Sequence, residues 1–276
     1  MTMAHQSKPA APSLDLDSDA LARDYERISA ERQFVSGQRL VQELAIAAGE
    51  RVLDVGCGTG LLAQHVADLV GVSGSVLGID PLRLRIELAQ GKARPNLAFR
   101  VGDAYALDGL PDGGFDVVYL NAVFHWLPEK RGPLRQFARL LRPAGRLGIS
   151  CGMKAQRSSF EDAIDSALAQ PPFVNHMQAN ARDVFRVDEP EMRTLLEGAG
   201  FSIAKLEVTS SVQYYATAED VLRFIHASSF GNFLGGLPDD LRPAARAAVG
   251  QALDRIASPE GIRRDVTRIV VVALRR

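Results

Sequence analysis

Short apolar runs alternate with amphipathic stretches along most of this chain. The runs RVLDV, SVLGID, NLAFRVG, FDVVYLN and RLGISC have the length and composition of buried strands. Between them, LLAQHVADLV, RLRIELAQGKA and KRGPLRQFARLLRP place apolar residues at helical spacing. Strands that alternate with helices predict an α/β fold: a doubly wound, mostly parallel sheet with helices on both faces.

The first 17 residues and two long insertions lie outside this alternation of strands and helices. Residues 1–17 are rich in Pro, Ala and Ser and predict a flexible tail, and residues 18–276 are expected to form one domain. The stretches 152–188 and 216–265 interrupt the alternation after strand ends, where open α/β sheets bind ligands. Both contain several aromatic residues, so we expect helical lids over a small, partly apolar substrate.

Composition narrows the class of protein further. The formal net charge of −1 gives no support for a nucleic-acid or membrane-surface partner. The two cysteines, Cys57 and Cys151, stand far apart, so neither a disulfide framework nor a metal site is expected. No apolar run approaches the roughly 20 residues that cross a bilayer, and the first residues lack the apolar core of a secretory signal. We therefore expect a cytoplasmic protein.

The stretch VLDVGCGTG, residues 52–60, places three alternating glycines directly after an apolar strand. Such loops bring backbone amides close to a nucleotide-like ligand. Asp80 ends the next strand 20 residues after Gly60, which is also the spacing of a nicotinamide dinucleotide site. Asp54 favours another ligand, because a carboxylate at this loop repels a pyrophosphate and attracts the sulfonium and ammonium groups of S-adenosylmethionine.

Four motifs in this order, VLDVGCGTG, GID, VGDAYAL and FDVVYLNAVFHWL, resemble the class I S-adenosylmethionine-dependent methyltransferases over about residues 20–150. The resemblance implies a Rossmann-like sheet with an antiparallel last strand, a methyltransferase activity and S-adenosylmethionine as cofactor. The cofactor residues that it implies are Asp54, Gly56, Gly58 and Gly60 around the methionine part, Asp80 at the ribose hydroxyls, Pro81 and Leu82 beside the adenine, Asp103 and Ala104 at the adenine amino group, and Asn121 near the methionine part. Each of these aspartates could instead cap a turn or a helix.

The stretch NAVFHWLPEKR, residues 121–131, follows the fourth strand, where this family presents the methyl group. His125 is the candidate catalytic base or substrate orienter, although a His-Trp pair often simply packs. Trp126 and Phe230 are candidate walls of the substrate site, and Tyr25 is a candidate lid. A phenol, alcohol or amine acceptor needs a base, whereas a carboxylate or thiolate does not.

The motif FHWLP and the helical insertion before the last strand resemble a subgroup that methylates small carboxylic acids: the trans-aconitate, malonyl-carrier-protein and juvenile-hormone-acid methyltransferases. Their substrates differ widely, so this resemblance does not name one. The sequence predicts methylation of a small molecule, most consistent with O-methylation by in-line transfer. The alternatives are an N-, C- or S-methyltransferase, an NAD-dependent oxidoreductase, or a non-catalytic binding partner with a methyltransferase fold.

Overall fold

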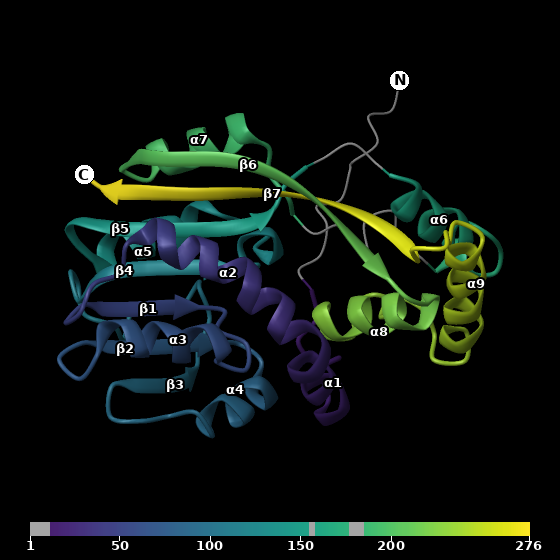
Figure 1. The fold of residues 1–276 in the computed structure, drawn as a ribbon, viewed down its shortest axis with the longest axis horizontal. Coiled ribbons are helices and arrows are strands. Elements are labelled where there is room, and N and C mark those ends of the chain that lie inside the picture. The colour runs from purple at the N-terminus through teal and green to yellow at the C-terminus, as the bar shows by residue number, and fades with distance from the viewer. Residues whose placement is uncertain (1–11, 155–157, 177–184) are drawn as a thin grey trace.

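A seven-stranded sheet runs through the part of the chain that the computed structural model describes, residues 12–154, 158–176 and 185–276 (Figure 1). The strand order is β3-β2-β1-β4-β5-β7-β6; the first five strands in the chain are parallel, and β7 is antiparallel to both of its neighbours. The predicted doubly wound sheet with an antiparallel last strand is therefore confirmed. The strands are β1 (Arg51–Val55), β2 (Ser75–Asp80), β3 (Leu97–Val101), β4 (Phe115–Asn121), β5 (Leu141–Gly152), β6 (Phe201–Tyr215) and β7 (Ile262–Arg275).

Helices cover both faces of this sheet. On one face α2, α3 and α4 pack on the strands, and on the other face α5 and α7 do so. The apolar spacing of α2 explains its place, because Leu40, Val41 and Leu44 recur on one side and are fully buried against the sheet. The helices are α1 (Asp19–Asp24), η1 (Tyr25–Ser29), α2 (Ala30–Leu44), α3 (Leu61–Val70), α4 (Arg83–Gln90), η2 (Phe124–Trp126), α5 (Arg131–Leu140), α6 (Ser159–Leu168), η3 (Phe173–Asn175), α7 (Glu189–Gly198), α8 (Ala218–Ser228) and α9 (Arg242–Asp254).

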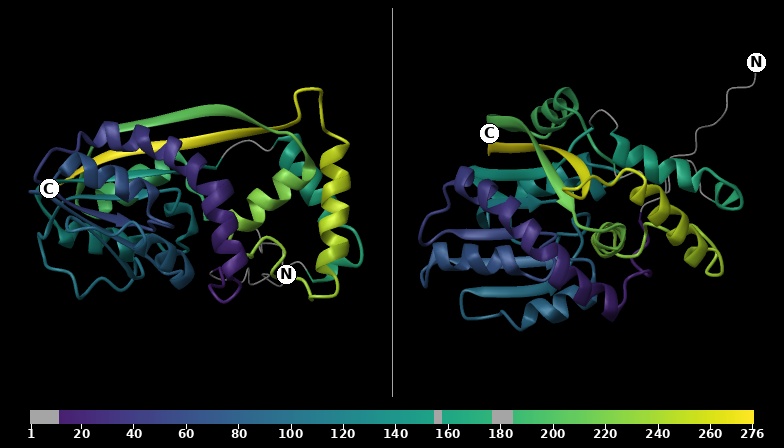
Figure 2. Two further views of the ribbon diagram at one scale, coloured as in Figure 1. Left: turned by 60° about the horizontal axis from the view of Figure 1, so that its bottom comes forward. Right: turned by 45° about the vertical axis from the view of Figure 1, so that its right-hand side comes forward.

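Strands β6 and β7 are long enough to leave the sheet and reach a second lobe. They pair from Phe201 and Arg275 at one end to Tyr215 and Ile262 at the other (Figures 1 and 2). At that far end α6, α8 and α9 pack together around an apolar cluster of their own. We call these three helices with the strand tips the cap. Both predicted insertions thus meet in one helical body.

Two segment boundaries predicted from the sequence need correction: the end of the second insertion and the extent of the flexible tail. The second insertion was expected to be helical to residue 265, but β7 begins at Ile262 because residues 262–265 continue the ladder with β6. The predicted flexible tail is partly packed, since Ser13 exchanges two backbone hydrogen bonds with the Asn232 side chain, at 2.9 and 2.8 Å. Residues 1–11 of that tail, and residues 155–157 and 177–184 of the first insertion, lie outside the described residues. The division into domains stays a prediction.

Candidate functional site

The predicted cofactor loop lies between β1 and α3, at the carboxyl edge of the parallel strands. Gly56, Gly58 and Gly60 have φ angles of 76°, 56° and 85°, which residues with a side chain rarely adopt. A Cβ on Gly56 would lie 2.3 Å from Val123 Cγ2, and one on Gly58 would lie 2.9 Å from the Tyr25 hydroxyl oxygen. Glycine therefore lets the loop pass directly beneath the segments that cover it.

Asp54 lies near the end of β1, and only 2% of it is exposed. The Tyr119 hydroxyl on the neighbouring strand β4 donates a hydrogen bond to Asp54 Oδ2 at 2.6 Å. Burial raises the pKa of Asp54 to about 7, and the nearby Asp80 carboxylate adds to the rise. A cation placed beside Asp54 would lower this pKa and hold the carboxylate ionised.

Asp80, at the end of β2, ties the glycine loop to the start of α4. Its Oδ2 accepts a hydrogen bond from the Gly58 amide, and its Oδ1 accepts one from the Leu82 amide, both at 2.9 Å. Burial raises the pKa of Asp80, while Arg85 opposes the rise. The next residue, Pro81, is exposed and Leu82 is buried. Ribose binding by Asp80 stays a prediction, because the contacts shown are structural ones.

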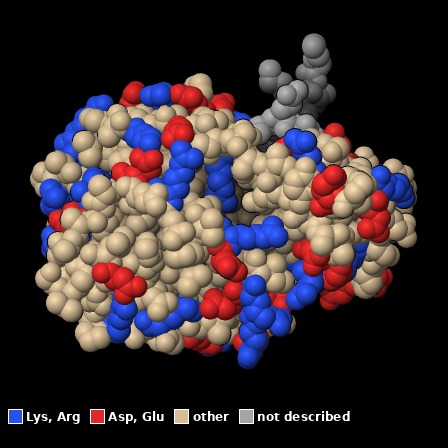
Figure 3. All heavy atoms as spheres, in the orientation of Figure 1, with Lys and Arg blue, Asp and Glu red and all other residues tan. Residues whose placement is uncertain are grey.

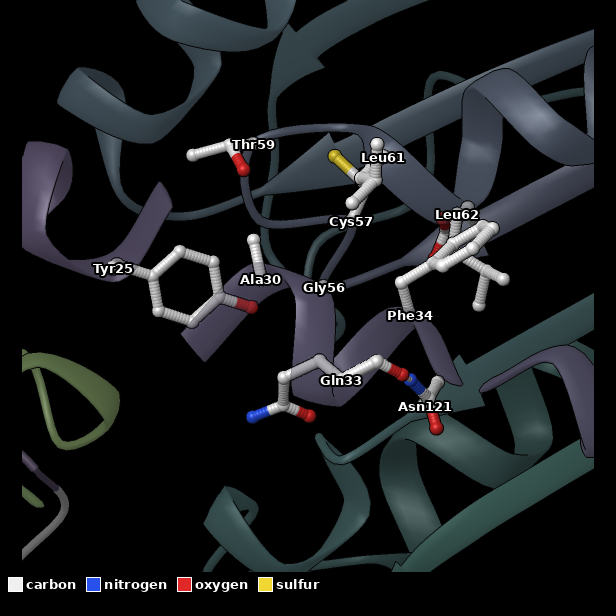
Figure 4. A pocket seen from close by; sticks show the side chains of 11 residues that line it. Tyr25, Ala30, Gln33, Phe34, Gly56, Cys57, Thr59, Leu61, Leu62 and Asn121 are labelled. Atoms are coloured by element: carbon white, nitrogen blue, oxygen red, sulfur yellow. Dashed lines mark hydrogen bonds between the residues drawn. The ribbon is translucent and has the colours of Figure 1, made fainter. Parts of the chain in front are cut away.

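A pocket opens beside Asp54 and the glycine loop (Figure 4). The N-terminal segments η1 and α2 form one wall, the loop forms the floor, and the end of β4 closes one side. The predicted residues Asp54, Gly56, Asn121 and Tyr25 line it. The full lining is Tyr25, Ala30, Gln33, Phe34, Asp54, Gly56, Cys57, Thr59, Leu61, Leu62 and Asn121.

The polar atoms of this pocket fit the amino-acid end of S-adenosylmethionine. Gln33 Oε1, Thr59 Oγ1 and Asn121 Oδ1 are buried and have no hydrogen-bond partner in the described chain. Asn121 is oriented by its Nδ2, which donates to the Gln33 carbonyl at 2.8 Å. Two amide oxygens and the Asp54 carboxylate are acceptors suited to an ammonium group, and the Thr59 hydroxyl can donate to a carboxylate.

The predicted adenine residues lie at the same edge of the sheet but outside the pocket lining. Asp103 follows β3, is exposed, and accepts a hydrogen bond from the Tyr105 amide at 3.0 Å. This contact is typical of an aspartate in a turn, which is the alternative that the sequence left open for Asp103. Ala104 beside it is buried. Adenine recognition by Asp103 and Ala104 stays a prediction.

The four predicted substrate residues lie along one row of rings. His125 and Trp126 on η2 have ring centroids 5.4 Å apart, and the Trp126 ring lies 5.1 Å from Phe230 in an edge-to-face arrangement. The Arg85 guanidinium links this row to the cofactor pocket, because it lies 5.8 Å from the Phe230 ring and 3.8 Å from the Tyr25 ring. Tyr25 also lies against Gly58, where an added Cβ would be 2.9 Å from its hydroxyl oxygen. The role of Tyr25 as a lid stays a prediction.

His125 lies in a cationic environment. Burial lowers its pKa well below the usual 6.5, and Arg186, Arg268, Lys130 and Arg264 lower it further. The ring is therefore neutral at physiological pH, and its Nδ1 is buried without a partner in the described chain. A neutral imidazole that resists protonation is a weak base but can still orient a ligand by a hydrogen bond.

Sequence reasoning missed several residues of this site. Gln33 lies on an amphipathic helix, where a glutamine in the sequence is expected on the solvent side and gives no signal of a site. Tyr119 carried a signal, since a hydroxyl inside the apolar run FDVVYLN needs a buried partner. Arg85 and Arg268 stand in stretches that predict only a helix and a strand, and Arg264 stands in the insertion 216–265, so none of the three gave a signal of its own.

Comparison with known proteins assigns the fold and the loop to a family. Residues 52–145 match the family described as a methyltransferase domain. The crystal structure of the YcgJ protein from Bacillus subtilis has the same fold, with a TM-score of 0.58 at 18% identity over 87% of this chain and 97% of that one. This chain contains a class I S-adenosylmethionine-dependent methyltransferase domain. The predicted family and its cofactor are confirmed.

Curated relatives match part of this chain. An arsenite methyltransferase of Aquipseudomonas alcaligenes is 38% identical over 117 residues, which cover 38% of this chain and 34% of the relative. The aklanonic acid methyltransferase DauC of a Streptomyces species is 35% identical over 136 residues, which cover 48% of this chain and 61% of the relative. The chain thus spans between one third and about three fifths of these relatives.

Two negative findings concern the residues that the structure describes. There, no three His, Cys, Asp or Glu side chains gather as they would around a metal ion. No described helix combines the length and the hydropathy that crossing a bilayer requires.

Proposed function

We propose that this protein is an enzyme that transfers a methyl group from S-adenosylmethionine to an oxygen atom of a small molecule. The observation that carries the proposal is that the Asp54 carboxylate lines the same pocket as two buried oxygens, Gln33 Oε1 and Asn121 Oδ1. Neither oxygen has a hydrogen-bond partner in the described chain. A pocket with these acceptors favours a cation and disfavours the pyrophosphate of a nicotinamide cofactor. The two relatives reported above support methyl transfer to a small molecule, because their names give arsenite and aklanonic acid as substrates.

The residues of this chain mainly position and enclose the reactants. S-adenosylmethionine, when bound, supplies a methyl group that passes in line to the acceptor while the sulfur keeps the bonding electron pair. Tyr25 and α2 cover the methionine end, and Trp126 with Phe230 walls the acceptor side. His125 orients the acceptor by a hydrogen bond and excludes water beside it. An acceptor that is already ionised fits this arrangement, because the cationic surroundings make His125 a weak base.

Two further assignments belong to this proposal. The cap and the segment after β5 act as lids over the acceptor, since both follow strand ends at the cofactor edge. The protein works in a reducing compartment, the cytoplasm, which its two free cysteines support. The resemblance to the carboxylate methyltransferase subgroup stays a prediction.

A transfer assay with methyl-labelled S-adenosylmethionine tests the function. The acceptor panel contains carboxylic acids, phenols, amines and thiols, and the atom methylated is read from the product. A second glycine substitution serves as control: Gly56→Ala places a Cβ 2.3 Å from Val123, whereas Gly71→Ala also puts a side chain at a positive φ, 64°, but has open space around it. We expect Gly56→Ala to abolish transfer and Gly71→Ala to retain it. A protein that binds S-adenosylhomocysteine but methylates no acceptor would point to the non-catalytic alternative.

A further inference from the structure

Two arginines of β7 lie between the cap and His125. Arg264 and Arg268 are four residues apart on the strand, so their side chains leave the same face. Arg264 lies 5.5 Å from the Phe160 ring of α6 and 5.4 Å from the Phe224 ring of α8. At the other end, both guanidinium groups act on His125 strongly enough to lower its pKa. The pair therefore spans the distance from the cap to the predicted acceptor side.

Neither guanidinium of this pair is neutralised within the described chain. Arg264 and Arg268 make no ion pair there, and Arg264 Nε and Arg268 Nη1 are buried without a hydrogen-bond partner. Burial lowers the pKa of Arg268, and repulsion from Arg264 lowers it further. By contrast Arg263, next in sequence and on the opposite face, is exposed and pairs with Asp265 at 2.8 Å.

Other cations border the same space. A Cβ on Gly152, which pairs with Arg268 across the ladder, would lie 3.5 Å from Arg186 Nε. Arg32 on α2 lies 4.5 Å from the Tyr215 ring, and Gln33 beside it lines the cofactor pocket. Figure 3 shows a hollow between the two lobes with Lys and Arg side chains at its border. Positive charge thus collects where the acceptor would lie.

We propose that Arg264 and Arg268 bind an oxyanion group of the methyl acceptor, a carboxylate or a phosphate, and thereby make this enzyme specific for anionic small molecules. The proposal rests on the methyltransferase function proposed above and names its substrate class. It concerns an anchoring group: the oxygen held by the guanidinium groups is not the atom methylated, because such pairing lowers its nucleophilicity.

The physical basis is the cost of burying like charges together. Two partly buried guanidinium groups without a counter-ion are unfavourable, and an oxyanion offsets their repulsion through charge-assisted hydrogen bonds. Arginine suits this role better than lysine, because its planar fork matches carboxylate and phosphate oxygens in pairs. The rings of Trp126 and Phe230 nearby accommodate an apolar body on the same ligand. The sulfonium of the cofactor adds a further attraction for an anion.

The stability of the ligand-free protein separates this role from a structural one. If Arg268 serves to bind an anion, the ligand-free protein carries its charge without a counter-ion. Arg268→Met then removes that charge, and we expect the melting temperature to rise by about 2–4 °C. The control Arg263→Met loses only a surface ion pair and should leave the melting temperature unchanged or slightly lower. A lower melting temperature for Arg268→Met would show that Arg268 stabilises the fold, and would overturn the proposal.

Binding to the protein saturated with S-adenosylhomocysteine tests the proposal directly. The probes are phenylacetate, phenyl phosphate and the neutral 2-phenylacetamide, which share one ring and differ in charge. By isothermal titration we expect a charged probe to bind and the amide not to. Arg264→Gln and Arg268→Gln should each weaken that binding about 10- to 100-fold, and Arg263→Gln should not change it. The tighter of phenylacetate and phenyl phosphate identifies the oxyanion.

The failures are distinguishable. If the wild type binds S-adenosylhomocysteine but prefers no charged probe over the amide, or if Arg268→Gln matches Arg263→Gln, the anionic acceptor is refuted and the methyltransferase function stands. If the wild type does not bind S-adenosylhomocysteine, the proposed function fails, and this inference fails with it.

Discussion

Replacing Asp54 by asparagine should remove most of the pH dependence of cofactor binding. The substitution keeps the shape of the side chain and an oxygen that can accept from the Tyr119 hydroxyl, but it cannot carry a negative charge. In the ligand-free protein the pKa of Asp54 is about 7, so the carboxyl is protonated in much of the protein at neutral pH. Cofactor with its ammonium group needs the ionised form, and it must therefore displace a proton.

The size of the effect follows from this pKa. If bound cofactor returns the carboxyl to its ordinary range, the affinity of the wild type rises about 25-fold between pH 5.5 and 7.5, since the ionised fraction rises by that factor. Asp54→Asn should bind about 10- to 100-fold more weakly than the wild type at pH 7.5. At pH 5.5 the two proteins should bind within a few-fold of each other, because almost every ligand-free wild-type molecule must then release a proton from Asp54 in order to bind.

The groups that face Asp54 do not obscure this dependence. Tyr25 on η1 has a pKa of about 12, and burial holds the pKa values of Tyr119 and Cys57 well above their usual ranges, so these three stay neutral. Asp80 on β2 has a raised pKa and acts with the same sign as Asp54, so Asp54→Asn retains a smaller slope. Isothermal titration with S-adenosylhomocysteine at pH 5.5, 6.5 and 7.5 measures it. A wild-type slope in Asp54→Asn would refute the reasoning.

Three further changes probe the rest of the site. Asp80→Ala should weaken S-adenosylhomocysteine binding by about 1–3 kcal/mol, because the variant loses charge-assisted hydrogen bonds and leaves the Gly58 and Leu82 amides without their acceptor. An unchanged affinity by calorimetry in a folded variant would show that Asp80 does not bind the cofactor. His125→Ala should raise the Michaelis constant for the acceptor found in the transfer screen and change turnover little; a rate loss of roughly 10²–10⁴-fold with a rising pH limb would instead make His125 a base. Amide hydrogen exchange in α6 and α8 should slow when S-adenosylhomocysteine and acceptor are both present, and protection confined to the glycine loop would show that the cap is not a lid.

The fold was predictable because the strands and the helices of this chain each have a characteristic pattern of apolar residues. Strands such as β1 and β4 are buried on both faces and read as continuous apolar runs, while α2 and α5 show the helical spacing of a one-sided helix. The cap was predictable only as two helical insertions. That they share one core depends on β6 and β7 extending past the sheet, which the run TRIVVVALRR alone did not indicate.

The place of a residue in the pocket was predictable where a motif fixes that residue to a strand end, as for Asp54, Gly56 and Asn121. Their contacts with the cofactor stay predictions. Tyr119 and Gln33 were not predicted, because their roles arise from strand and helix neighbours far away in the sequence. Arg264 and Arg268 were missed for the same reason. Their importance comes from lying partly buried on the same strand face without a counter-ion in the described chain, and no linear sequence pattern indicates that.

Equilibrium binding of S-adenosylhomocysteine and NAD to the purified protein tests the central claim most directly. Isothermal titration should give one site for S-adenosylhomocysteine that Gly56→Ala abolishes and Gly71→Ala retains, and no measurable binding of NAD. Binding of NAD in place of S-adenosylhomocysteine would contradict the assignment of the glycine loop and Asp54 to a cationic methyl donor.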